Sequence, residues 1–97
     1  MNFKHPLRRP VLSRQTRYRW DPLRREHQIV FSEGVLVLNE SAAAIAMLCD
    51  GRLVEELVTA LAVQFPGEDV AADVDAFLTR LSAKGLLCDA EIIAEKS

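Results

Sequence analysis

Cysteine and histidine are the residue types here best suited to nucleophilic or metal chemistry, and their spacing supports neither. Cys49 and Cys88 lie far apart, and the chain holds no Cys-x-x-Cys or Cys/His pair at metal-ligand spacing. A lone cysteine is most often a small buried apolar residue. His5 and His27 also lack a partner at ligand spacing, so we interpret both as solvated side chains. The sequence predicts no metal site and no catalytic cysteine.

The carboxylates and glycines do not suggest an active site either. Asp69, Asp73 and Asp75 fall outside the apolar stripe of a helix predicted over residues 70–81, which indicates a solvated face. General acid–base catalysis needs convergent groups, and phosphate binding needs a glycine-rich loop. The chain offers neither pattern. We therefore expect a protein that is not an enzyme, with no catalytic residues and no cofactor.

Composition indicates one globular domain with an uneven charge distribution. The chain has 97 residues, of which 49% are hydrophobic and 27% charged, as in ordinary globular proteins. Residues 1–32 hold eight Lys/Arg against two Asp/Glu, whereas residues 33–97 hold four against twelve. A basic region on an acidic body fits nucleic-acid binding, contact with an acidic partner face, or solubility.

The N-terminal third predicts an arm and three strands. Residues 1–14 contain Pro6, Pro10 and four basic side chains without periodicity, which indicates a mobile or loosely docked basic arm. Strands are predicted over residues 17–20, 28–31 and 35–38, with a tight turn at Gly34 before the last one.

The strand over residues 35–38 is apolar on both faces, since Val35, Leu36, Val37 and Leu38 follow one another. Two interpretations stay open. The strand is either sandwiched between a neighbouring strand and the core, or it is an edge strand that a partner covers.

A central helix follows directly. Asn39 and Ser41 can cap its first turn, the alanines favour it, and Gly51 ends it. Apolar periodicity predicts two more helices over residues 54–65 and 70–81. Leu86 and Leu87 then fold back on the core.

This order of elements predicts an α+β, winged helix-turn-helix-like fold, in which three N-terminal antiparallel strands precede a three-helix bundle. The recognition domain would span residues 15–88, between the arm and a polar tail over residues 89–97. No apolar run approaches the length of a membrane helix and no secretory signal begins the chain, so we expect a cytoplasmic protein without membrane contact.

A winged helix suggests DNA binding, but the surface charge argues against it. The helix that begins at residue 70 presents Asp73, Asp75, Thr79 and Arg80, with only Lys84 added at its end. Phosphates repel such carboxylates. No nucleic-acid partner is therefore expected. An apolar edge strand can instead accept an extended peptide by β-augmentation, with a helix as the second wall of the groove.

The residues also resemble a known family, the pyrroloquinoline quinone (PQQ) biosynthesis protein D (PqqD) family. The resemblance covers about residues 15–88, with the same order and spacing of short blocks. These blocks are Arg19-Trp20-Asp21-Pro22, Leu38-Asn39-Glu40-Ser41-Ala42-Ala43-Ala44-Ile45, Leu48-Cys49-Asp50-Gly51, Asp73-Val74, Phe77-Leu78 and Gly85-Leu86-Leu87. One departure is Leu53, at a place where family members often carry the threonine that caps the next helix.

The resemblance implies a peptide chaperone, or recognition element, for a ribosomally made and modified peptide (RiPP). Such a protein binds the precursor peptide PqqA as an added strand and presents it to the radical SAM enzyme PqqE. Carried onto this chain, the peptide-binding residues would be Val35, Leu36, Val37, Leu38, Val74, Phe77, Leu78 and Leu81. The alternatives are a winged-helix DNA-binding protein and a recognition domain for another modified peptide. An uncovered strand edge also allows a homodimer.

Overall fold

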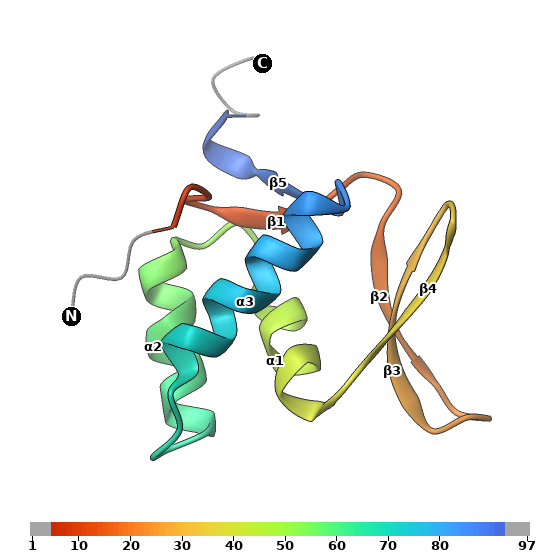
Figure 1. Cartoon of the computed structure of the whole chain (residues 1–97), viewed down its shortest axis with the longest axis horizontal. Helices are drawn as coiled ribbons and strands as arrows, with labels where there is room; N and C mark the ends of the chain where they lie inside the picture. The colour runs from red at the N-terminus through yellow and green to blue at the C-terminus, as the bar shows by residue number, and fades with distance from the viewer. Residues whose placement is uncertain (1–4, 93–97) are drawn as a thin grey trace.

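The computed structural model describes residues 5–92 and contains two antiparallel sheets and a group of helices (Figure 1). The larger sheet lies to one side of the helices, and the smaller sheet runs along one end of them. The strands are β1 (Pro10–Leu12), β2 (Arg17–Asp21), β3 (Glu26–Phe31), β4 (Gly34–Leu38) and β5 (Leu87–Asp89). The helices are α1 (Glu40–Leu48), α2 (Val54–Gln64) and α3 (Val70–Ala83).

The three-stranded sheet has the order β2-β3-β4, so β4 is an edge strand. Its register aligns Tyr18, Ile29 and Leu36 across the sheet, and Ile29 is fully buried. The expected α+β class and antiparallel strands are confirmed. Of the two interpretations of the strand over residues 35–38, the structure confirms the edge position, whereas its covering by a partner stays a prediction.

Helix α1 begins where the sequence predicts, because the Asn39 side-chain oxygen accepts a hydrogen bond from the backbone N–H of Ala42 at 2.8 Å. Three of its four buried residues are alanines, Ala43, Ala44 and Ala46, which lets α2 and α3 pack closely against it. Residues 90–92 are helical as well, so the described chain has one helical segment beyond the three expected. Within residues 5–92, no helix has the length and apolarity that a membrane crossing requires.

The core lies between the three helices and the inner face of the larger sheet. Each helix contributes side chains with almost no exposed surface: Ile45 from α1, Leu57 and Leu61 from α2, and Leu78 and Leu81 from α3. Leu86 and Leu87 are also buried, as the sequence predicts. The apolar stripes of the helices therefore serve the interior first.

Residues 8–13 are docked by backbone hydrogen bonds, more firmly than the predicted mobile or loosely docked arm. Strand β1 pairs with β5, and the Ser13 N–H donates to the carbonyl of Leu86 at 2.8 Å. The Arg8 carbonyl accepts from the N–H of Val54 at 2.8 Å, at the start of α2. This segment therefore ties the start of α2 to the chain that follows α3. A three-residue strand that begins with proline has too short a pattern to reveal itself in the sequence.

The predicted polar tail over residues 89–97 is also corrected at its first residue. Asp89 ends β5 and is only 7% exposed. Its carboxylate accepts backbone N–H bonds from Arg8 (2.9 Å), Arg9 (3.2 Å) and Glu91 (3.0 Å). Burial by itself raises the pKa of Asp89, but the three donors hold it below its ordinary value. Residues 1–4 and 93–97 of the predicted arm and tail lie outside the described residues.

The carboxylate of Asp89 should make stability depend on pH. Its pKa is lower in the folded than in the unfolded chain, so its stabilisation is present above about pH 4 and is lost as pH falls through the folded value. We expect Asp89→Asn to lower the free energy of unfolding by about 1–3 kcal/mol at pH 7. The difference in free energy of unfolding between Asp89→Asn and the wild type should be smaller at about pH 2.5 than at pH 7. The reason is that protonation of Asp89 in the wild type removes a hydrogen-bond acceptor, as the substitution does.

Urea unfolding at both pH values measures this effect, with Asp73→Asn on the exposed face of α3 as the control. An Asp89→Asn deficit of equal size at both pH values would contradict it.

A second prediction concerns the start of α2. Leu53 occupies the N-cap and makes no side-chain cap bond, whereas the Glu56 carboxylate accepts the N–H of Leu53 at 2.8 Å. Only half of a reciprocal capping box is therefore present. Leu53→Thr should raise the free energy of unfolding by about 1 kcal/mol in urea, and Leu53→Ala should give no such gain. Equal stability of Leu53→Thr and the wild type would reject this account.

Candidate functional site

The free edge of β4 presents unpaired backbone groups. A two-residue turn places Phe31 opposite Gly34, and hydrogen-bonded pairs alternate along an antiparallel ladder from there. Gly34, Leu36 and Leu38 therefore exchange hydrogen bonds with β3. The N–H and C=O groups of Val35 and Val37 point away from β3, toward the open edge.

The side chains of β4 alternate in the same way. Leu36 and Leu38 lie on the face toward the helices, where Leu38 is 5% exposed. Val35 and Val37 lie on the opposite face and are 52% and 56% exposed. Natural sheets usually protect an edge with charge, proline or a bulge, and none of these occurs within this strand. β4 is therefore suited to accept another strand.

The four α3 residues predicted for the site lie mostly in the core. Val74, Leu78 and Leu81 have no exposed surface, and Phe77 is 7% exposed. Phe77 alone among them lines a surface hollow, which has a volume of about 200 Å³ and lies between α3 and the start of α1. The structure thus brings one of the four to a surface where a ligand can lie.

The hollow beside Phe77 continues from the end of β4, because Asn39 follows β4 directly and lines the hollow. Its apolar lining consists of Ala42, Ile45, Ala76 and Phe77. Its polar lining consists of Asn39, Ser41, Asp73 and Arg80. Sequence reasoning missed Ala76 and Arg80 because it followed the apolar stripe of α3. Their helical positions directly beside that stripe are the sequence signal that could have identified them.

The two cysteines lie in different surroundings. Cys49 is buried, and burial together with the charge of Asp50 raises the pKa of its thiol to about 12. Its sulfur is therefore protonated at neutral pH. Cys88 is partly buried, with its sulfur 3.4 Å from the hydroxyl of Ser13. In the described part of the chain, His, Cys, Asp and Glu side chains form no group of three that could hold a metal ion.

The histidines differ from the predicted solvated side chains. The side chain of His5 is 4% exposed, and its ring contacts Thr79 at 3.3 Å and Asp75 at 3.7 Å. His27 is hydrogen-bonded to the hydroxyl of Tyr18 at 2.6 Å. Both rings therefore contact other parts of the fold. The partners of His5 lie on α3, far away in the sequence, whereas Tyr18 lies on the strand next to His27.

Two of the sequence blocks that resemble a known family lie at turns in this structure, one around Asp50 and one around Asp21. The Asp50 carboxylate accepts the N–H and the guanidinium of Arg52, whose hydrogen bond lowers the pKa of Asp50 to about 2. Gly51, at φ +95°, donates its N–H to the carbonyl of Pro10. Asp21 accepts the N–H groups of the β2–β3 turn, and that of Arg24 contributes most to its lowered pKa.

Comparisons with known proteins agree with these blocks. A family model described as "Coenzyme PQQ synthesis protein D (PqqD)" matches residues 26–87. A protein of Rhodopseudomonas palustris (strain TIE-1) named "PqqA binding protein" is 40% identical over 85 residues, which cover 84% of this chain and 83% of that protein. A protein of the same name from Azotobacter vinelandii is 41% identical over 71 residues, covering 71% of this chain and 77% of its own length.

A solved structure agrees with the fold as well. It is the solution NMR structure of the PqqD truncation of Methylobacterium extorquens PqqCD, described as a functional, stand-alone RiPP recognition element. The match has a TM-score of 0.69 and 29% identity, and it covers 81% of this chain and 87% of that one. From the family match, the relatives and this structure together, the chain belongs to the PqqD family of coenzyme PQQ synthesis proteins.

Proposed function

We propose that this protein binds the precursor peptide PqqA as an added strand on β4 and presents it to the radical SAM enzyme PqqE. The observation that carries the proposal is the open edge of β4, where Val35 and Val37 leave both backbone and side chains uncovered. Two relatives named for PqqA binding support the choice of peptide. The likeness to a RiPP recognition element supports the mode of action.

Backbone pairing would supply the orientation of the peptide and part of its affinity. Val35 and Val37 offer N–H and C=O groups that an extended peptide can pair with, each bond contributing about 0.5–1.5 kcal/mol net. Backbone bonds do not distinguish sequences, so selection must come from side chains. Alternate side chains of the added strand would lie over the exposed valines and near the hollow at Phe77.

The eight proposed binding residues then divide into two roles. Val35, Leu36, Val37 and Leu38 form the strand that the peptide pairs with, and Phe77 offers the wall of the hollow. Val74, Leu78 and Leu81 hold α3 in place from the core, because they have no exposed surface. Ala76 and Arg80 join the proposed site through the hollow.

The alternative of DNA binding is less well supported. In a winged-helix arrangement, the β3–β4 hairpin is the wing and α3 is the recognition helix. The exposed side of α3 carries Asp73 and Asp75, which phosphates repel.

Peptide presentation also fits the protonated thiol of Cys49, since the chemistry would be done by the enzyme partner.

Removing one backbone N–H at the edge should weaken peptide binding. We expect Val37→Pro to lower PqqA affinity by about tenfold or more, because it removes an outward-facing donor but no bond to β3. Val37→Thr keeps the donor and nearly the same shape, and it should bind within about threefold of the wild type. Titration calorimetry measures both affinities, with circular dichroism to confirm folding. Equal affinities for Val37→Pro and Val37→Thr in folded protein would exclude pairing at this strand.

Filling the hollow on α3 should also weaken binding. Ala76→Glu places a larger, charged side chain beside Phe77, and we expect about a tenfold lower PqqA affinity. Ala72→Glu is the matched control, because Ala72 is an exposed alanine on the same helix outside the hollow. If both variants bind PqqA equally well, the hollow takes no part in recognition.

A further inference from the structure

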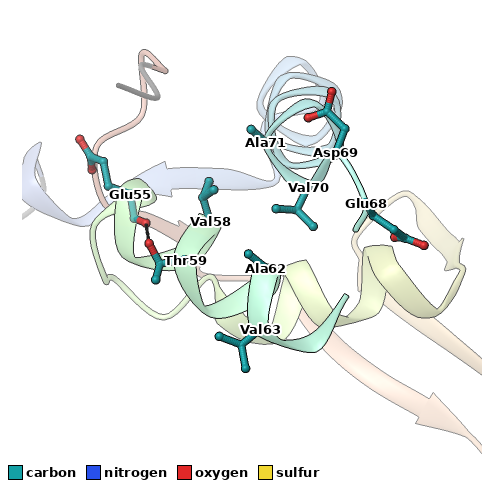
Figure 2. A pocket seen from close by; sticks show the side chains of 9 residues that line it. All are labelled: Glu55, Val58, Thr59, Ala62, Val63, Glu68, Asp69, Val70 and Ala71. Atoms are coloured by element: carbon teal, nitrogen blue, oxygen red, sulfur yellow. Dashed lines mark hydrogen bonds between the residues drawn. The ribbon is translucent and has the colours of Figure 1, made fainter. Parts of the chain in front are cut away.

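We propose that the groove between α2 and α3 is a second docking surface, which binds an amphipathic helix of a partner protein that carries basic residues at both ends. The groove has a volume of about 550 Å³ and lies between the two helices (Figure 2). Val58 and Val70 form its buried floor, and Ala62 and Val63 lie along the α2 side.

The α2 side of the groove is a second stripe beside the buried one. Glu55, Val58, Thr59, Ala62 and Val63 follow the spacing i, i+3, i+4, i+7 and i+8, so they share one face of the helix. Val63 is 78% exposed despite its aliphatic side chain. A shallow extension of this face, lined by Glu56 and Ala60 among others, widens the apolar area.

Beyond Glu55 at its start, this face carries no charge, which distinguishes it from an ordinary solvated face. Residues 57–67 contain no charged side chain, although Thr59, Ala62 and Val63 are exposed. Surface helices usually carry charged residues on the side away from the core. The exposed side of α3 does so, with Asp73 and Arg80. An exposed aliphatic face of this kind is typical of a surface that another protein covers.

Carboxylates at both ends of the groove define the charge of that partner. Glu55 and Glu56 lie at the start of α2, and Glu68 and Asp69 lie beyond its other end. Among residues 5–92, the ion pairs include none of these four carboxylates. An 11-residue helix spans about 16 Å. A partner helix with an apolar stripe and Lys or Arg about three turns apart therefore matches both the floor and the two ends.

A second copy of this chain does not match the groove. Across α1, α2 and α3, Arg80 is the one basic residue, so none of these helices has positive charge at both ends. Docking α2 of one copy into the groove of another would bring carboxylates together. Charge complementarity therefore selects a different, basic protein.

The groove is also separate from the proposed peptide site. It shares no lining residue with the hollow at Phe77. α2 lies on the far side of α1 and α3 from β4 (Figure 1). A peptide on β4 and a helix in the groove could be bound at the same time, and the inference does not depend on the proposed function.

A designed peptide pair tests the inference directly. The first is a synthetic helical 16-mer with Leu and Ala along one face and two Lys at each end, and the second carries Glu in place of every Lys. The probes are titrated into ¹⁵N-labelled full-length protein, and amide shifts are followed at low and high salt. We expect saturable shifts within residues 55–63 and 68–71, about tenfold tighter binding of the Lys peptide, and weaker binding at high salt.

Variants make the result specific to the groove. Val63→Lys should weaken binding of the Lys peptide about tenfold, because it adds a positive charge to the apolar side. Met47→Lys is the control, since Met47 is 54% exposed on α1 and does not line the groove. Equal binding of both peptides, no saturable shifts, or shifts centred on β4 would overturn the proposal. So would a dimer in sedimentation equilibrium that Val63→Lys dissociates, which would assign the groove to a second copy.

Discussion

The structure depends on one constraint, which is that backbone N–H and C=O groups need hydrogen-bond partners. β3 satisfies this requirement on both sides, between β2 and β4. β4 satisfies it on one side only, and Val35 and Val37 keep outward-facing groups that water or another strand must pair with. Because α1 starts immediately after β4, capped by Asn39, this open edge is held at a fixed place beside the helices. The position of any added strand therefore follows from the fold.

Carboxylates that accept backbone N–H groups hold the rest of the scaffold in place. Asp21 closes the β2–β3 turn, Asp50 orders the α1–α2 turn, and Asp89 joins the N-terminal segment to the chain after α3. The pKa of each lies below its ordinary value, as expected for carboxylates that accept several hydrogen bonds. Two of them lie in the sequence blocks that indicate the family. Those two blocks thus report the architecture, whereas the exposed valines of β4 and Ala76 of the proposed recognition surface lie outside the family blocks.

Local signals in the sequence predicted the parts of the fold that depend on local chemistry. The cap at Asn39, the turn at Gly34 and the helical stripes all appear where their residue types require them. Strand β1 was missed because it is short and depends on β5, which lies near the other end of the chain. The prediction that His5 is a solvated side chain was wrong for the same reason, because its contacts are on α3.

The candidate site could be predicted only on its strand side. An apolar run in an edge strand stands out, because such edges are normally protected. On α3 the same apolar signal marks the core, so Val74, Leu78 and Leu81 are buried. The surface beside them is made by Ala76 and Arg80, and tertiary packing determines that these two residues line a hollow with Phe77.

Amide hydrogen exchange of the full chain, with and without PqqA, tests the central claim most directly. If PqqA adds as a strand to β4, the amides of Val35 and Val37 should exchange more slowly in the complex. The amide of Tyr18, which faces the open edge of β2, should not change. Protection of Tyr18 instead, or unchanged exchange at both valines under saturating PqqA, would contradict the account.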